Sequence, residues 1–112
     1  MTTAPQSKFS LTLPTQDNAT PPNTLTVGEI TSLAFVVGAN TYTWPVPATE
    51  PVGATVTAPF ASLTPPFVPV PGTAYTADVY AVDVNGNGLP SASVSWTQSA
   101  PVPAAPTGFT VA

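Results

Sequence analysis

The stretch from residue 70 to residue 96 constrains the fold of this chain more than any other part. Small, apolar and aromatic residues at positions 75, 77, 79 and 81 alternate with Thr76, Asp78 and Tyr80, as in a strand with one buried face. A turn rich in Asn and Gly follows at 85–88, and apolar residues then alternate with serines over 91–96. The stretch therefore predicts two antiparallel strands joined by a tight turn.

Similar alternation recurs along the rest of the chain. The segments that we expect to form strands are 9–13, 25–27, 30–37, 42–46 and 54–60. Helices are disfavoured, because the chain has sixteen prolines and each proline inside a helix costs about 3 kcal/mol. Pro45 and Pro47 lack an amide donor, so we expect the strand around Trp44 to lie at a sheet edge or to stop early. These patterns predict an all-β sandwich of about seven short strands with extended termini.

The first strand of the 70–96 stretch carries a resemblance to a known family. The residues concerned are Pro71-Gly72-Thr73, Tyr75, Ala77, Val79, Ala81-Val82-Asp83, Gly86-Asn87-Gly88 and Ser91. They resemble the last two strands of a fibronectin type III domain, an immunoglobulin-like sandwich. The resemblance implies that Tyr75 forms a tyrosine corner, in which its hydroxyl bonds to backbone a few residues upstream. It implies a structural role for Tyr75 and Gly72, and it does not imply a function.

We expect three regions: an N-terminal arm over 1–6, a sandwich domain over 7–98 and a proline-rich C-terminal arm over 99–112. Three prolines make the first part of this C-terminal arm stiff. Phe109 and Val111 alternate with Thr110, so the tip is expected to form a short strand with one apolar face. Such a strand must add to a sheet edge, its own or a neighbour's. Phe109 and Val111 are therefore candidate partner-binding residues.

Charge and composition exclude several classes of function. The chain has one basic residue, Lys8, against five acids, and its net charge is -4. A phosphate backbone would be repelled, so we expect neither nucleic-acid binding nor polybasic attachment to a membrane. The chain has no Cys and no His, which removes the usual metal ligands and imidazole bases. No apolar run approaches the length of a membrane span. We therefore expect no catalytic residue, no metal and no cofactor.

Three constellations of polar residues have a structural and a functional interpretation. Residues 83–88 match the start of a calcium loop, but its twelfth position is Val94, which cannot coordinate; we expect a turn. Glu29 and Glu50 lie in expected loops, with nothing in their spacing to pair them for glycoside hydrolysis. Trp44 and Trp96 share the inward phase, which favours core packing. Tyr80 faces outward and is a candidate contact residue for protein or sugar.

The expected function is that of a non-enzymatic structural protein. The chain starts with Met and shows no export signal, it has few charges, and it resembles modules that act outside cells. This combination suggests a bacteriophage virion protein, specifically a capsid decoration protein that contacts other protein subunits, including copies of itself. The alternatives are a fibronectin III-like spacer repeat or a sugar-binding module from a secreted, extracellular or cell-surface bacterial protein. The tail at 104–111 resembles the opening of a next repeat, which favours the spacer.

Overall fold

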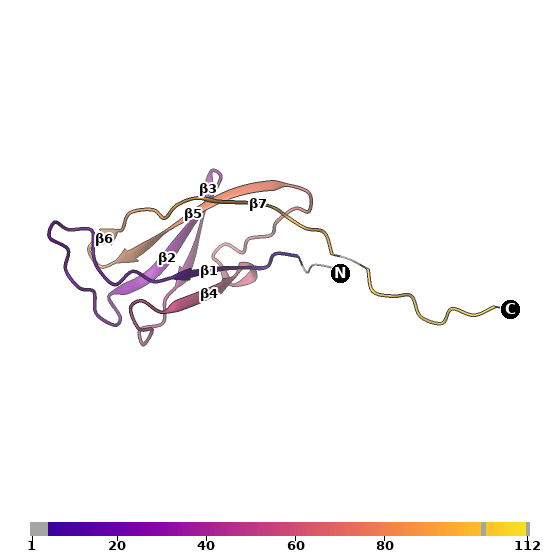
Figure 1. Cartoon of the computed structure of the whole chain (residues 1–112), viewed down its shortest axis with the longest axis horizontal. Coiled ribbons are helices and arrows are strands. Elements are labelled where there is room, and N and C mark those ends of the chain that lie inside the picture. Colours follow the sequence, from indigo (N-terminus) through magenta and orange to yellow (C-terminus); the bar gives the residue numbers. More distant parts are fainter. Residues whose placement is uncertain (1–4, 102, 112) are drawn as a thin grey trace.

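The computed structural model describes residues 5–101 and 103–111, and over these residues it confirms the all-β prediction. Seven strands form two sheets (Figure 1). One short 3-10 turn, η1, covers Phe60–Ser62. The strands are β1 (Lys8–Thr12), β2 (Ile30–Val37), β3 (Asn40–Pro45), β4 (Thr55–Pro59), β5 (Ala74–Asp83), β6 (Gly86–Asn87) and β7 (Val94–Thr97).

The larger sheet is built around the antiparallel pair β2 and β5. β2 carries the longest β-branched and apolar run of the chain, and its inward residues pair with those of β5, as Phe35 does with Val79. β3 lies at one edge, as its prolines predict. Thr43 of β3 exchanges two backbone hydrogen bonds with Thr64, of 3.0 and 2.9 Å, so the proline-rich segment partly covers this edge.

The second strand of the predicted 70–96 hairpin is interrupted. β6 and β7 both pair with β5, and the segment between them follows the same edge of β5 without forming a strand. Gly88 N donates to Ala81 O over 2.7 Å, and Ser91 N donates to Val79 O over 2.8 Å. The Ser91 hydroxyl also accepts a hydrogen bond from Val79 N at 3.1 Å, where a regular strand would offer a backbone carbonyl.

The smaller sheet contains only β1 and β4, paired antiparallel over five residues each. Phe60 N donates to Ser7 O at 2.8 Å, and Leu13 N donates to Ala54 O at 2.9 Å. In the segment that contains β1, these bonds are made by the odd-numbered residues Ser7 and Leu13. Residues that hydrogen-bond to the partner strand alternate with residues that do not in an antiparallel ladder. The backbone groups of Lys8, Ser10 and Thr12 therefore point away from β4.

The aromatic side chains gather at the end of the sandwich where β1 begins. Phe9 stacks on Phe35 with ring centroids 4.7 Å apart, and its edge meets Trp96 at 5.8 Å. Phe67 packs against Phe60 at 4.9 Å. This cluster closes the two sheets against each other at that end.

Besides the interrupted strand, two expectations about the N-terminal half of the chain differ from the structure. The short strand expected over 25–27 does not form: Leu25 is buried beside an isolated bridge from Gln16 to Thr24, whereas Val27 is exposed. Of the N-terminal arm over 1–6, residues 1–4 lie outside the described residues. Gln6 is fixed, because its backbone carbonyl accepts a hydrogen bond from Gln98 Nε2 and its side chain accepts one from Ser99 N, both at 2.9 Å.

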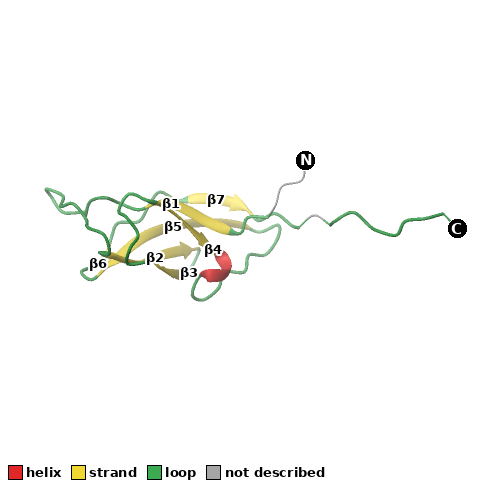
Figure 2. Ribbon diagram, turned by 90° about the horizontal axis from the view of Figure 1, so that it is seen from below, coloured by secondary structure: helices red, strands yellow, loops and turns green. Residues whose placement is uncertain are grey.

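The C-terminal arm projects from the sandwich at the end where the aromatic residues gather (Figures 1 and 2). The chain measures 75 Å along its longest axis and only 29 and 25 Å along the other two. No residue of 103–111 belongs to a strand or a helix. The opposite end, at the β5–β6 turn, lies far from this arm along the same axis (Figure 1).

Candidate functional site

The corner predicted at Tyr75 has the expected contact. The Tyr75 hydroxyl accepts a hydrogen bond from Val70 N at 2.8 Å, five residues upstream. Gly72, at φ +82°, donates from its amide to Gln98 O over 2.8 Å, and this conformation is one that residues with a Cβ rarely adopt. The Tyr75 ring is half-buried and stacks on Trp96 at 5.3 Å. The corner therefore joins the proline-rich segment to β5 and β7.

Trp44 and Trp96 both pack against the core and are half-buried. Trp44 pairs with Leu33 across β3 and β2. Trp96 Nε1 donates to Gln98 Oε1 at 3.1 Å, and Gln98 is the buried polar residue that in turn contacts Gln6. The sequence pattern gave no indication of Gln98, because a lone Gln after a strand is ordinarily exposed.

Tyr80 is half-buried on the outer face of the larger sheet, paired with Ala34. It lines a shallow depression together with Val36, Asp78 and Pro90. The depression contains one carboxylate and no second exposed aromatic ring, so its chemistry does not define a sugar platform.

The segment 83–88 forms the turn of the β5–β6 hairpin. Asp83 Oδ1 accepts a hydrogen bond from Asn85 N at 2.8 Å, which is the Asx geometry typical of turns. Within residues 5–101 and 103–111, no group of three or more His, Cys, Asp or Glu is arranged to hold a metal ion. In the same described part, no helix is long and apolar enough to cross a membrane.

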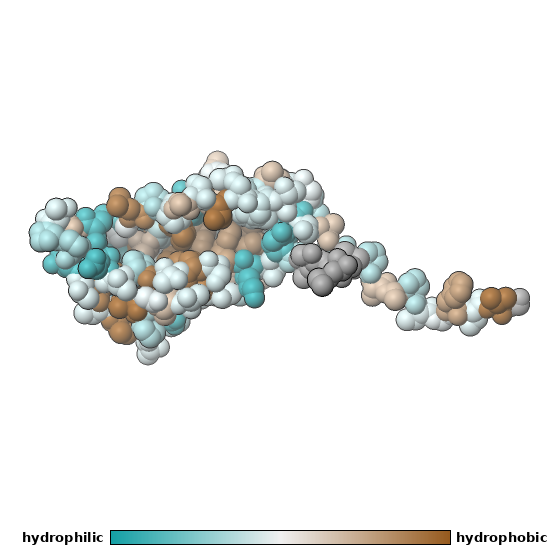
Figure 3. Space-filling model, viewed as in Figure 1, coloured by the Kyte–Doolittle hydropathy of each residue, from teal (hydrophilic) through white to brown (hydrophobic). Residues whose placement is uncertain are grey.

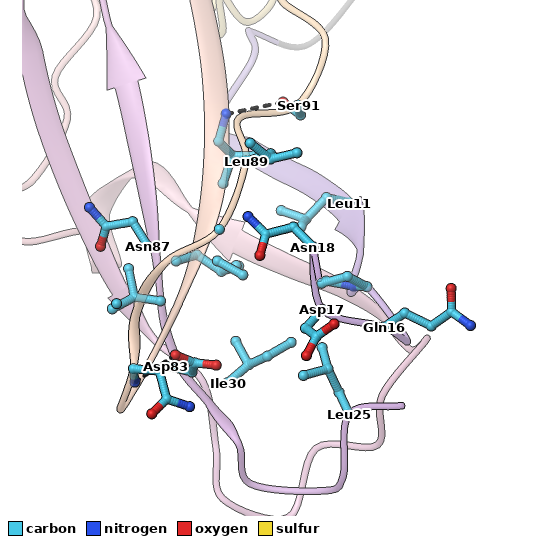
Figure 4. A pocket seen from close by; sticks show the side chains of 18 of the residues that line it. Leu11, Gln16, Asp17, Asn18, Leu25, Ile30, Asp83, Asn87, Leu89 and Ser91 are labelled. Carbon is cyan, nitrogen blue, oxygen red and sulfur yellow. Dashed lines mark hydrogen bonds between the residues drawn. The ribbon is translucent and has the colours of Figure 1, made fainter. Parts of the chain in front are cut away.

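A hollow lies between the two sheets, and we name it the β1 groove (Figure 4). It encloses about 570 Å³ and is bounded by β1 on one side and by the segment from β6 to Ser91 on the other. Its apolar lining consists of Leu11, Pro14, Leu25, Ile30, Leu33, Val79, Ala81, Val82 and Leu89. Figure 3 shows the corresponding apolar hollow on the face of the molecule that contains β1.

The β1 groove exists because one side of the sandwich is uncovered. Of the inward-facing residues of β5, Ala77 is 3% exposed, but Val79 and Ala81 are only half-buried. Leu89 is 72% exposed and Val94 is 57% exposed, although Val94 shares the inward phase of Trp96. Val79, Ala81 and Leu89 line the β1 groove. The sandwich therefore lacks cover along this side.

The far end of the β1 groove is shaped by the loop that begins at Asp17. Asp17 Oδ1 accepts hydrogen bonds from Asn23 N at 2.8 Å and Ala19 N at 3.0 Å, and Oδ2 accepts one from Asn23 Nδ2 at 2.9 Å. Three hydrogen bonds hold the pKa of the Asp17 carboxyl below its ordinary value. In decreasing order of effect, they come from the Asn23 backbone, the Asn23 side chain and the Ala19 backbone. Asp17 and Asp83 give the rim of the groove a negative charge.

The candidate partner-binding residues of the tail are free in this structure. Phe109 is 90% exposed and Val111 is 93% exposed, and together they form an apolar tip with no charged residue in 99–112. The short strand expected at this tip does not form: residues 103–111 contain no strand. The β1 groove was not predicted, because alternation identifies which face of a strand is apolar and does not tell whether another element covers it.

Comparisons of the chain with protein-family models, with curated protein sequences and with solved structures found no match. The fold and the site therefore define the class of the protein: an all-β, sandwich-like domain with an open apolar groove at one side and an exposed apolar tail.

Proposed function

We propose that this chain is a non-enzymatic structural protein that is held in an ordered assembly by its C-terminal tail. The observation that carries this proposal is the exposure of Phe109 and Val111 on an uncharged arm that projects from the sandwich. Apolar side chains of this size are buried when a partner surface is present. A partner that pairs with the tail as an added strand provides that burial together with backbone hydrogen bonds.

The assembly that we propose is the virion of a bacteriophage, with the chain as a capsid decoration or other accessory protein. Two features support this. The chain has only six charged residues among 112, which suits a surface in contact with protein neighbours. The Tyr75 corner and the β5–β7 pairing support the resemblance to fibronectin type III modules, which serve in adhesion and scaffolding.

A spacer repeat of a secreted bacterial protein is the second candidate. The sequence of the tail favours it, because Ala105-Pro106-Thr107-Gly108-Phe109-Thr110-Val111 resembles the first strand of a further repeat. In that case the tail continues into a neighbouring domain of the same polypeptide.

The test is the protein content of purified phage particles that encode this chain. The virion proposal predicts that quantitative mass spectrometry of gradient-purified particles finds the chain in a fixed ratio to the major shell protein. Deletion of residues 99–112 is expected to remove it from the particles. A chain absent from purified particles, or one that remains after the deletion, would contradict the proposal.

A further inference from the structure

We propose that the tail of one copy of this chain adds as a strand to the free edge of β1 in a second copy, with Phe109 and Val111 in the β1 groove. This inference rests on the proposed role of the tail as an attachment arm, and it names the partner as the same chain. The result is a head-to-tail assembly of sandwiches.

Among the described residues, β1 has an unpaired edge that can accept a strand. In the part of the chain that the structure describes, β1 pairs with β4 alone. The amides and carbonyls of Lys8, Ser10 and Thr12 point away from β4, in the phase that an added strand needs. The opposite edge of the same sheet, on β4, is less suitable. Pro59 is paired with Lys8 in the non-bonded phase, so its backbone faces the free edge of β4, and it has no amide to donate there.

The apolar lining of the β1 groove lies beside that edge. Val79, Ala81 and Leu89 face the groove without full cover, and Leu11 lies on the β1 side. A strand added to β1 directs alternate side chains into this space. The uncharged tail suits the apolar floor, and its lack of acids avoids repulsion from Asp17 and Asp83 at the rim.

The tail matches the edge of β1 in length and in the alternation of its side chains. Residues 107–111 are five residues, the length of β1, and Phe109 and Val111 share one phase while Thr110 takes the other. Edge pairing supplies the backbone hydrogen bonds, and the groove supplies sites for alternate side chains, as in other cases of strand addition.

The positions of the tail and of the β1 groove on the molecule suit a head-to-tail contact between copies. The tail leaves the sandwich at the end where β1 begins, whereas the β1 groove extends toward the β5–β6 turn at the opposite end (Figure 1). The tail of one copy therefore enters the groove of the next from the far end and runs antiparallel to β1. Residues 99–106 span roughly 25 Å when extended, enough to separate two sandwiches placed end to end. Such an interface is heterologous and forms a filament or a closed ring.

The test uses the full-length chain and two classes of variant, measured by sedimentation velocity over a range of concentrations. The double variant Phe109→Asp/Val111→Asp changes only the exposed tail. Ser10→Pro removes an amide on the free edge of β1, and Thr57→Pro is its matched control, because Thr57 is opposite Ser10 and its amide points to the free edge of β4.

The wild-type chain and Thr57→Pro are expected to associate as concentration rises. The tail variant and Ser10→Pro are expected to remain monomeric, with loss of each apolar contact weakening association by about 10- to 150-fold. A mixture of these two variants should form a dimer and no larger assembly. The tail variant supplies an intact groove, and the Ser10→Pro chain supplies an intact tail. The proposal is overturned if association is unchanged in either variant. It is also overturned if the wild-type chain is monomeric at every concentration, for example because its tail folds onto its own groove.

If Ser10→Pro does not fold, the tail variant still decides the matter, because it leaves the sandwich unchanged. Failure here is distinguishable from failure of the proposed function. Purified protein that does not self-associate but is present in phage particles leaves the virion role standing with another partner. Protein that self-associates but is absent from particles leaves this inference standing alone.

Discussion

At the scale of single residues, the Tyr75 hydroxyl provides the sharpest link between sequence and stability. Tyr75→Phe removes the acceptor of the Val70 amide. Because Val70 is exposed and water can replace the lost partner, we expect a loss of about 0.5–1 kcal/mol in the free energy of unfolding. Urea denaturation measures it. Tyr80→Phe, on the outer face of the same strand, is the matched control, and equal effects of the two substitutions would contradict a special role for the Tyr75 corner.

Asp17 makes a prediction about pH. Its folded-state pKa is below the ordinary value of 3.8 because three hydrogen bonds favour the carboxylate. The stabilisation is therefore fully present above about pH 4 and is lost as the pH falls through the lower folded-state pKa. We expect the urea midpoint to fall between pH 5 and pH 2 in the wild type and to fall less steeply in Asp17→Asn. Parallel pH profiles of the two proteins would show that the Asp17 loop does not contribute.

At the scale of elements, the interrupted edge of β5 depends on Ser91. The Ser91 hydroxyl accepts the hydrogen bond of Val79 N, so Ser91→Ala leaves that amide without its acceptor. We expect a loss of about 1 kcal/mol and faster hydrogen exchange at the Val79 amide. Ser93→Ala removes a hydroxyl from the same exposed segment and is the control. An unchanged exchange rate at Val79 in Ser91→Ala would mean that water or another group takes over the contact.

The elements also show how far the sequence could predict this fold. Alternation located β2 and β5 closely, because one face of each strand consists of apolar and aromatic residues. Alternation failed over 25–27, because Leu25 is buried although it lies in a loop and not in a strand. It also predicted a regular strand over 92–96, whereas regular pairing begins only at Val94. In the second case Ser91 replaces a backbone partner with its side chain, a substitution that periodicity does not reveal.

The candidate site was only half predictable for a related reason. The apolar tip at Phe109 and Val111 follows from local alternation. The β1 groove depends on a missing neighbour: Val79 is only half-buried and Leu89 is exposed, because the side of the sandwich next to β1 is uncovered. Whether a face is covered depends on contacts between segments far apart in the chain, and a local pattern contains no information about these contacts.

At the scale of the whole molecule, an open groove and an exposed apolar tail in one chain predict that stability depends on whether the groove is occupied. The full-length variant Phe109→Asp/Val111→Asp keeps its groove, so a synthetic peptide of residues 104–111 should bind and stabilise it by mass action. At a peptide concentration 100 times the dissociation constant, the gain is about 2.7 kcal/mol, which corresponds to a rise in Tm on the order of 10 °C for a domain of this size. Differential scanning calorimetry with increasing peptide measures the rise.

A peptide that carries the same two aspartates is the control and should leave the Tm unchanged. The Ser10→Pro chain should also respond weakly to the wild-type peptide, because a proline on the free edge of β1 removes a donor that the added strand requires. If the wild-type and aspartate peptides shift the Tm equally, the effect is not recognition of Phe109 and Val111. If neither peptide shifts it, the β1 groove does not accept the tail, and the exposed tip must bind a different surface.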